Sequence, residues 1–206
     1  MEIIPLIYGE SVLPESAVFL GGDKEVERSI VFKLYLIKEK DKLILIDAGC
    51  ETMPGFVMRN FIGTVKALEN AGVYPYEITD LVITHSHHDH IECAKYFKNA
   101  VIHIQEDEFE SGKKYIPDGF KVNVFSESFF VTSSVTIIKI GGHSKGSCVV
   151  EIKHNGRTYV VAGDECYSRE CLAKKIPTGS FVNKEKSIEF INKYSDGKYD
   201  VLLCHD

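Results

Sequence analysis

The segment VITHSHHDHI, residues 82–91, joins a short aliphatic run to four of the chain's eight histidines and an aspartate. The aliphatic residues favour a buried strand, and the polar cluster follows where that strand would end. Imidazole is the commonest metal-binding side chain in proteins, and carboxylates also bind cations. The segment therefore predicts a metal site at a strand end, with its remaining ligands supplied by other parts of the chain.

The two halves of the chain repeat one order of elements. Residues 29–49 predict a β-hairpin, residues 61–72 an amphipathic helix, and residues 80–85 a short strand that ends in His85. The second half predicts the same succession, with Asn-Gly at its hairpin turn: strands at 147–153 and 157–164, a helix at 183–194, and a strand at 199–206. The repeat predicts an internal pseudo-twofold arrangement.

Matching residues close the matching elements. Asp47 and Asp164 end the two hairpins, and His205 ends its strand as His85 ends the earlier one. We therefore expect an α/β fold of two mixed sheets packed face to face, with helices outside and the strand ends meeting along one rim. Further strands are predicted at 100–104, 121–125 and 134–140, and no flexible linker divides the chain, which predicts a single domain over residues 1–206.

The composition argues against several classes of partner. The net charge is −6, and no run of Lys and Arg would form a basic surface for nucleic acid. The N-terminus lacks the basic-then-apolar layout of a signal peptide, and no segment approaches the roughly 18 apolar residues of a membrane span. The six cysteines have no CxxC spacing and are expected to be reduced. These features predict a cytoplasmic protein with a small-molecule substrate and leave the oligomeric state open.

Three further ligand candidates also follow predicted strands: His143 in IGGHSKGS, Asp164 in VVAGDECYS and His205 in LLCHD. In a strand-end loop, side chains 85 and 87 point the same way, while a turn over 88–90 brings Asp89 and His90 to a neighbouring point. If each point held a cation, two cations a few ångströms apart would need an anion between them. Ligands rich in nitrogen favour Zn²⁺, with Fe or Mn as alternatives at the second position.

The motifs HSHHDH, GGHSKGS and AGD and the final strand-end histidine, with LIDAG upstream, resemble those of the metallo-β-lactamase superfamily. The resemblance implies an αββα sandwich with a two-metal site. It assigns His85, His87 and His143 to one metal. It assigns Asp89, His90 and His205 to the other metal, makes Asp164 the bridge between them, and places Asp47 beside the ligands.

The remaining histidines and the cysteines near the motifs have simpler interpretations. His88 has no assigned ligand role, and His103 and His154 lie outside the motif and are expected to be structural. Cys166 and Cys204 are neighbours of ligands in sequence, but buried packing is the favoured interpretation for both.

Among superfamily members, the chain is most similar to the N-acyl homoserine lactonases. The similarity rests on the Asp-x-x-Tyr spacing of Asp164 and Tyr167, the closing LLCHD, and a helix after PTGSF at 177–181. It implies a dinuclear hydrolase, with zinc as the expected metal, in which a metal-bridging hydroxide attacks the carbonyl of a small lactone or ester. The candidate catalytic residues are Asp89, Asp164 and Tyr167.

Two features keep the substrate and the reaction open. Residues 105–128 look shorter than the acyl-pocket region of the lactonases, which also continue past the His-Asp found at 205–206. The alternatives are a glyoxalase II-like thioesterase and a non-hydrolytic di-iron protein that reacts with O₂ or NO. Tyr167 has a packing interpretation beside the catalytic one.

Overall fold

The computed structural model describes residues 1–206, which form two compact units. The first unit comprises Met1–Ser11 and Val31–Ser126, and the second comprises Val12–Ile30 and Glu127–Asp206. Two boundaries fall within the long strands β1 (Glu2–Pro14) and β2 (Glu27–Glu39), and the third lies between Ser126 and Glu127. The expectation of a single domain stays a prediction.

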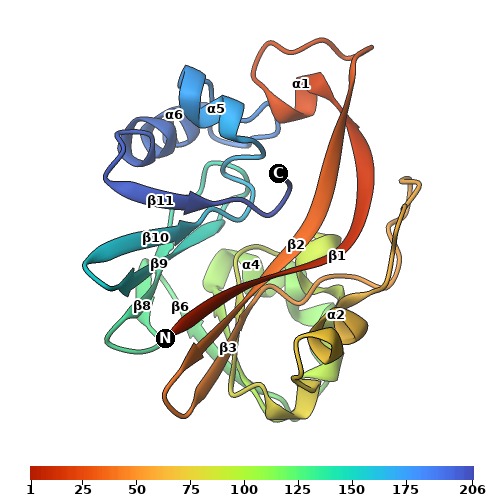
Figure 1. Ribbon diagram of the computed structural model, residues 1–206, viewed down its shortest axis with the longest axis vertical. Helices are drawn as coiled ribbons and strands as arrows, with labels where there is room; N and C mark the ends of the chain where they lie inside the picture. The colour runs from red at the N-terminus through yellow and green to blue at the C-terminus, as the bar shows by residue number, and fades with distance from the viewer. The chain divides into compact units, whose positions relative to one another are not determined.

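A mixed sheet of six strands, in the order β1-β2-β3-β4-β5-β6, organises the first unit (Figure 1). After the antiparallel β2–β3 pair, the strands run parallel: β3 (Lys42–Ile46), β4 (Asp80–Ile83), β5 (Val101–Gln105) and β6 (Lys121–Phe125). Ile44, Leu45, Leu81 and Val82 are fully buried, as expected for central parallel strands made of near-continuous aliphatic runs. The helices of this unit are α2 (Thr64–Asn70), α3 (His88–Ile91) and α4 (Glu106–Gly112), with 3₁₀ turns η1 (Pro75–Glu77), η2 (Glu92–Tyr96) and η3 (Lys113–Tyr115).

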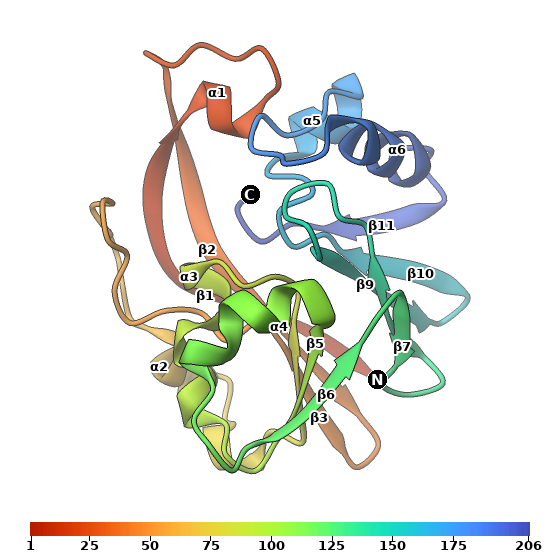
Figure 2. The same ribbon diagram turned by 180° about the vertical axis from the view of Figure 1, so that it is seen from behind.

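A second mixed sheet, in the order β11-β10-β9-β8-β7, organises the other unit. Its strands are β7 (Ser128–Phe130), β8 (Val135–Lys139), β9 (Cys148–His154), β10 (Arg157–Val161) and β11 (Tyr199–Leu202). The helices are α1 (Glu15–Val18), α5 (Arg169–Lys174) and α6 (Lys184–Tyr194). Phe190, Ile191 and Tyr194 of α6 join Val160 and Val201 in one buried cluster, so this helix covers β10 and β11 (Figure 2).

The predicted repeat is confirmed in the strand pairing. In the first unit, β2 and β3 form an antiparallel hairpin and β4 then pairs parallel to β3. In the second unit, β9 and β10 form the hairpin and β11 pairs parallel to β10. Asp47 and Asp164 follow the hairpins, and His85 and His205 follow the parallel strands, so the polar residues occupy equivalent places in the two units.

Several elements were not predicted from the sequence. They are β1, β7, α1, α4, α5, the three 3₁₀ turns, and α3, where the sequence predicted only a turn over 88–90. The predicted helix at 61–72 is shorter in the structure, beginning at Thr64 after Gly63 and ending at Asn70 before Gly72. Gly63 and Gly72 both have positive φ angles, 76° and 73°, which end the helical geometry on either side.

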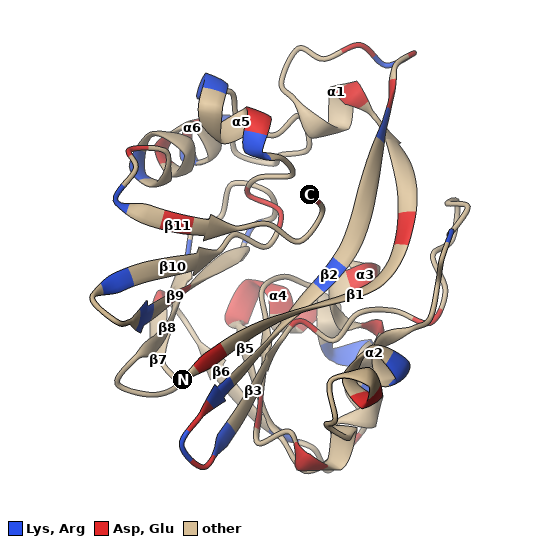
Figure 3. Cartoon of the chain, viewed as in Figure 1, with Lys and Arg blue, Asp and Glu red and all other residues tan.

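The charged residues show no segregation by sign along the chain. Lys and Arg are spread over many elements and interspersed with Asp and Glu (Figure 3). None of the helices has the length and apolar character required to span a bilayer. All six cysteines are free thiols and buried.

Candidate metal centre

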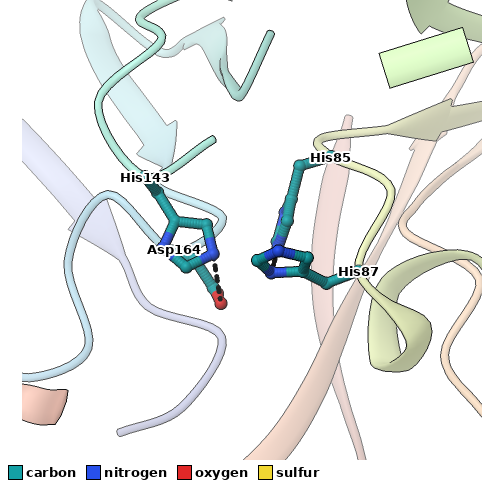
Figure 4. Close-up of side chains that lie close together, drawn as sticks. All are labelled: His85, His87, His143 and Asp164. Carbon is teal, nitrogen blue, oxygen red and sulfur yellow. Dashed lines mark hydrogen bonds and ion pairs between the residues drawn. The ribbon is translucent and has the colours of Figure 1, made fainter. Parts of the chain in front are cut away.

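His85 and His87 follow β4 and present their imidazole rings to each other. The Nε2 atom of His85 lies 3.1 Å from Nδ1 of His87, and the ring centroids are 4.6 Å apart. Figure 4 shows both rings projecting from the same loop toward a common point. The expectation that side chains 85 and 87 point the same way after a strand is therefore confirmed.

Asp47 holds this histidine loop in place. Its carboxylate accepts hydrogen bonds from the backbone N–H of Thr84 at 2.8 Å and from the Thr84 hydroxyl at 2.9 Å. Its other oxygen lies 2.8 Å from Nδ1 of His90. A carboxylate bound to one ring nitrogen fixes the tautomer and directs the other nitrogen, Nε2, toward a ligand. Asp47 thus orients His90. The sequence resemblance also implied that Asp47 lies beside the ligands.

The turn after His87 continues as α3, which begins at His88 and carries Asp89 and His90, both buried. The Nε2 atom of His90 lies 3.5 Å from Oδ2 of Asp89. His88 points elsewhere: its Nε2 lies 2.8 Å from the carbonyl oxygen of Thr52, and its Nδ1 lies 3.2 Å from the Tyr115 hydroxyl. These contacts give His88 a structural role.

Glu108 of α4 is a site residue that the sequence reasoning missed. It is 3% exposed, and its Oε2 accepts hydrogen bonds from the Ser86 backbone N–H at 2.8 Å and the Ser86 hydroxyl at 2.7 Å. Ser86 lies between His85 and His87, so Glu108 fixes the backbone from which both rings project. In the sequence Glu108 lies among other acidic residues of the segment QEDEFESG, so nothing distinguishes it from a surface acid.

In the second unit, His143 lies in the loop between β8 and β9. Its Nδ1 lies 2.7 Å from the carbonyl oxygen of Ser180, which leaves Nε2 as the nitrogen available for a ligand bond. The buried side chain of Glu165 accepts hydrogen bonds from the backbone N–H groups of Gly142 and His143, at 3.1 and 3.2 Å. Burial raises the pKa of Glu165, while its hydrogen bonds with Ser147 and His143 oppose that rise. Sequence reasoning also missed this residue.

Asp164 has a histidine at each carboxylate oxygen. Its Oδ2 lies 3.5 Å from Nε2 of His143 (Figure 4), and its Oδ1 lies 3.2 Å from Nε2 of His205. The Tyr167 hydroxyl donates a hydrogen bond to Oδ2 at 2.8 Å, and the Tyr167 ring stacks on His205 with centroids 5.1 Å apart. One carboxylate thus faces two different imidazoles, and a phenol lies next to it.

The spacing of these donor atoms fits metal ligation. Two nitrogens at about 2.0–2.1 Å from a tetrahedral zinc ion lie roughly 3.3 Å apart. Four pairs of donors within the units lie 3.1–3.5 Å apart: His85–His87, His90–Asp89, His143–Asp164 and His205–Asp164. The same residues make up the groups of histidines and aspartates that could hold a metal ion. Each unit therefore carries part of a ligand set.

The two cysteines beside these ligands are packed in the interior. Cys166 and Cys204 are 0% and 1% exposed. Cys166 directs its thiol to the carbonyl oxygen of Ser168, at 3.2 Å. Neither belongs to the groups of side chains that could hold a metal, in keeping with the packing interpretation.

Comparison with known proteins places this arrangement in a family. The family model described as the metallo-beta-lactamase superfamily matches residues 34–205. N-acyl homoserine lactonase AiiB of Agrobacterium fabrum is 32% identical, over 84% of this chain and 78% of its own length. A protein of Methanocaldococcus jannaschii named a probable metallo-hydrolase is 28% identical, over 79% of this chain and 70% of its own length.

Solved structures show the same fold. A crystal structure of an AiiA mutant of B. thuringiensis with N-decanoyl-L-homoserine bound superposes with a TM-score of 0.85 at 18% identity, covering 99% of this chain and 92% of that chain. AidC, described as a dizinc quorum-quenching lactonase, superposes with a TM-score of 0.77 at 17% identity, covering 98% of this chain and 86% of that chain. The predicted αββα fold class is therefore confirmed. The chain belongs to the metallo-β-lactamase superfamily and is a metal-dependent hydrolase of that family.

Proposed function

We propose that the chain is a dinuclear metal hydrolase that cleaves small lactones or esters. In this proposal residues 1–206 belong to one domain, since the family model matches residues 34–205. His85, His87 and His143 bind one metal, Asp89, His90 and His205 bind the other, and Asp164 bridges them. The observation that carries the proposal is the pair of histidines at the two oxygens of Asp164.

Zinc is the metal we propose for both positions. Five of the seven ligands are imidazoles, a donor set that suits zinc better than the oxygen-rich sets preferred by magnesium or calcium. The structural similarity to the dizinc lactonase AidC supports the same choice. Iron or manganese at the Asp89 position is the alternative that metal analysis would reveal.

The bound metals would acidify a water molecule and polarise the carbonyl group of the substrate. The residues of the chain do the rest. Asp47 keeps His90 in one tautomer, and the carboxylates of Asp89 and Asp164 offset the positive charge at the centre. The Tyr167 hydroxyl, which donates its one hydrogen bond to Asp164 in this structure, would turn to the carbonyl oxygen as negative charge develops on it.

Lactones and esters are the proposed substrate class because AiiB, 32% identical to this chain, is named an N-acyl homoserine lactonase. The Asp-x-x-Tyr spacing of Asp164 and Tyr167 supports the same class, because a phenol next to the proposed metals could serve as a donor to a carbonyl oxygen. Thioesters are chemically close and belong in the same assay.

Two measurements test the proposal. Elemental analysis of protein purified without added metal should give about two equivalents of zinc per chain, and the same preparation should hydrolyse at least one lactone or aryl ester. Iron with visible absorbance and no hydrolysis would instead favour an O₂- or NO-reactive protein. Hydrolysis confined to thioesters would favour a thioesterase.

A further inference from the structure

A small cavity of about 190 Å³ lies in the second unit, directly against Tyr167 and His205. Its apolar wall consists of Val18, Phe19 and Ile30, all less than 9% exposed. These residues come from the end of α1 and the start of β2. The cavity therefore adjoins one proposed metal ligand and the proposed hydrogen-bond donor to the substrate, so a substrate bound at these residues would have a substituent beside it.

The size of the cavity limits that group. Pockets for drug-sized ligands measure about 300–1,000 Å³, and this cavity is well below that range at about 190 Å³. The buried side chains of Phe19 and Ile30 would need to move to lengthen it. Short substituents fit the space, and the wall at Phe19 and Ile30 limits how far a longer chain extends within it.

The charged side chains around the cavity disfavour anionic groups. Arg28 is its only lining cation, and the Arg28 Nε donates a hydrogen bond to Glu15 at 2.9 Å while a terminal nitrogen lies 3.9 Å from Glu170. The guanidinium also lies over the Phe19 ring, 5.3 Å from its centroid. Glu170 and Asp206 line the cavity as well, so its lining carries two carboxylates against one guanidinium that already has acidic partners.

We propose that this cavity receives a short, uncharged substituent of the substrate, and that the enzyme therefore prefers short-chain neutral esters or lactones. The inference rests on the proposed hydrolase function and narrows its substrate class. It also disfavours substrates that would place a carboxylate in this space, such as acidic peptide thioesters. Phe19 sets the length limit, and Glu170 contributes to the rejection of anions.

A series of 4-nitrophenyl esters tests the inference on the zinc-loaded enzyme. We expect kcat/KM for the butyrate ester to exceed that for the octanoate ester by at least about tenfold, the scale of pocket discrimination between alkyl groups. The succinate monoester, close in length to butyrate but anionic, should also react about tenfold more slowly than the butyrate ester. Equal values for butyrate and octanoate, or for butyrate and succinate, would overturn the inference.

Two variants assign these preferences to the cavity. Phe19→Ala should raise the octanoate-to-butyrate ratio by about tenfold, because it lengthens the apolar wall. Glu170→Gln, at a side chain 38% exposed and so compatible with folding, should raise the succinate-to-butyrate ratio about threefold. Phe130→Ala, at a residue 69% exposed on β7, is the matched control and should leave both ratios unchanged.

The outcomes separate this inference from the proposed function. If the zinc-loaded enzyme hydrolyses esters but the ratios do not change in folded Glu170→Gln and Phe19→Ala, the cavity assignment is wrong and the hydrolase stands. If Phe19→Ala fails to fold, the succinate-to-butyrate ratio of Glu170→Gln decides whether the cavity assignment is right. If the enzyme hydrolyses no ester, thioester or lactone, the proposed function fails and the inference fails with it.

Discussion

Each carboxylate oxygen of Asp164 faces a different histidine, and the proposal of a two-metal site rests on this one residue. A carboxylate that faces a single imidazole would complete one metal site. A carboxylate that faces two can offset the repulsion between two nearby cations. The Tyr167 hydroxyl donates its one hydrogen bond to the same carboxylate, so its proposed catalytic role requires that hydrogen bond to pass from Asp164 to the substrate.

Tyr167→Phe tests whether that hydroxyl is catalytic. We expect both metals and the fold to be retained while kcat/KM falls by roughly tenfold to a thousandfold, the usual cost of one oxyanion hydrogen-bond donor. Steady-state kinetics and metal analysis on the same samples measure both effects. Tyr76→Phe, at a residue 64% exposed, is the control. A variant that loses metal but keeps its rate per bound metal pair would show that Tyr167 only positions Asp164.

Glu108→Ala tests the residue that fixes the loop between His85 and His87. Removing the acceptor for the Ser86 N–H and hydroxyl should lower zinc affinity about 10–100-fold, as is typical when a group supporting metal ligands is lost. Competition with a chromogenic chelator gives the affinity without any activity measurement. Glu110→Ala on the same helix, at a side chain 71% exposed, should bind zinc like the wild type. Equal affinities in the two variants would refute the positioning role.

Strand β4 connects the metal centre to a second polar cluster at its opposite end. Asp80 begins the strand, and its carboxylate lies 2.7 Å from Lys42 Nζ on β3 and 3.0 Å from His103 Nε2 on β5. Burial raises the pKa of Asp80, but the hydrogen bonds from His103, Lys42 and Thr79 outweigh it and hold the pKa at about 2. The cluster therefore ties the neighbouring strands β3, β4 and β5 together at the end remote from the histidines.

Asp80→Asn should lower the free energy of unfolding at pH 7 by on the order of 2 kcal/mol, since each pKa unit corresponds to about 1.4 kcal/mol. Because the folded-state pKa lies below the unfolded value of about 3.9, this stability is present above pH 4 and is lost as the pH falls toward 2. Urea unfolding of both proteins at pH 7 and from pH 5 to 2 measures the difference. A difference that does not shrink as the pH falls toward 2 would show that the cause is packing rather than charge.

For the molecule as a whole, local signals predicted the two hairpins and the strands that pair with them, while elements such as β1, β7 and α4 escaped prediction. The hairpins and the strands they pair with were visible because alternating apolar runs flank short turns such as Asn155-Gly156. Strand β1 contains Pro5 and Gly9, both unfavourable in strands, and forms because it lies at the edge of its sheet, where proline is tolerated. Strand β1 forms by pairing with β2, and the periodicity of a sequence carries no information about such pairing.

Some residues of the candidate site could also be predicted from the sequence and others could not. The ligand candidates could be found because histidines and aspartates recur directly after predicted strands. Glu108 and Glu165 could not, since their partners are 22 residues away along the chain, at Ser86 and His143. Buried acids that serve backbone N–H groups look like surface acids in a sequence.

The central claim is that one carboxylate bridges two metals in a hydrolase, and metal stoichiometry of Asp164→Asn beside the wild type tests it most directly. Asparagine preserves the shape of the side chain and removes its charge. We predict about two zinc equivalents per chain with ester hydrolysis in the wild type, and one or fewer with hydrolysis lost in the variant, while the fold is retained. Two equivalents and full hydrolysis in Asp164→Asn would contradict the account.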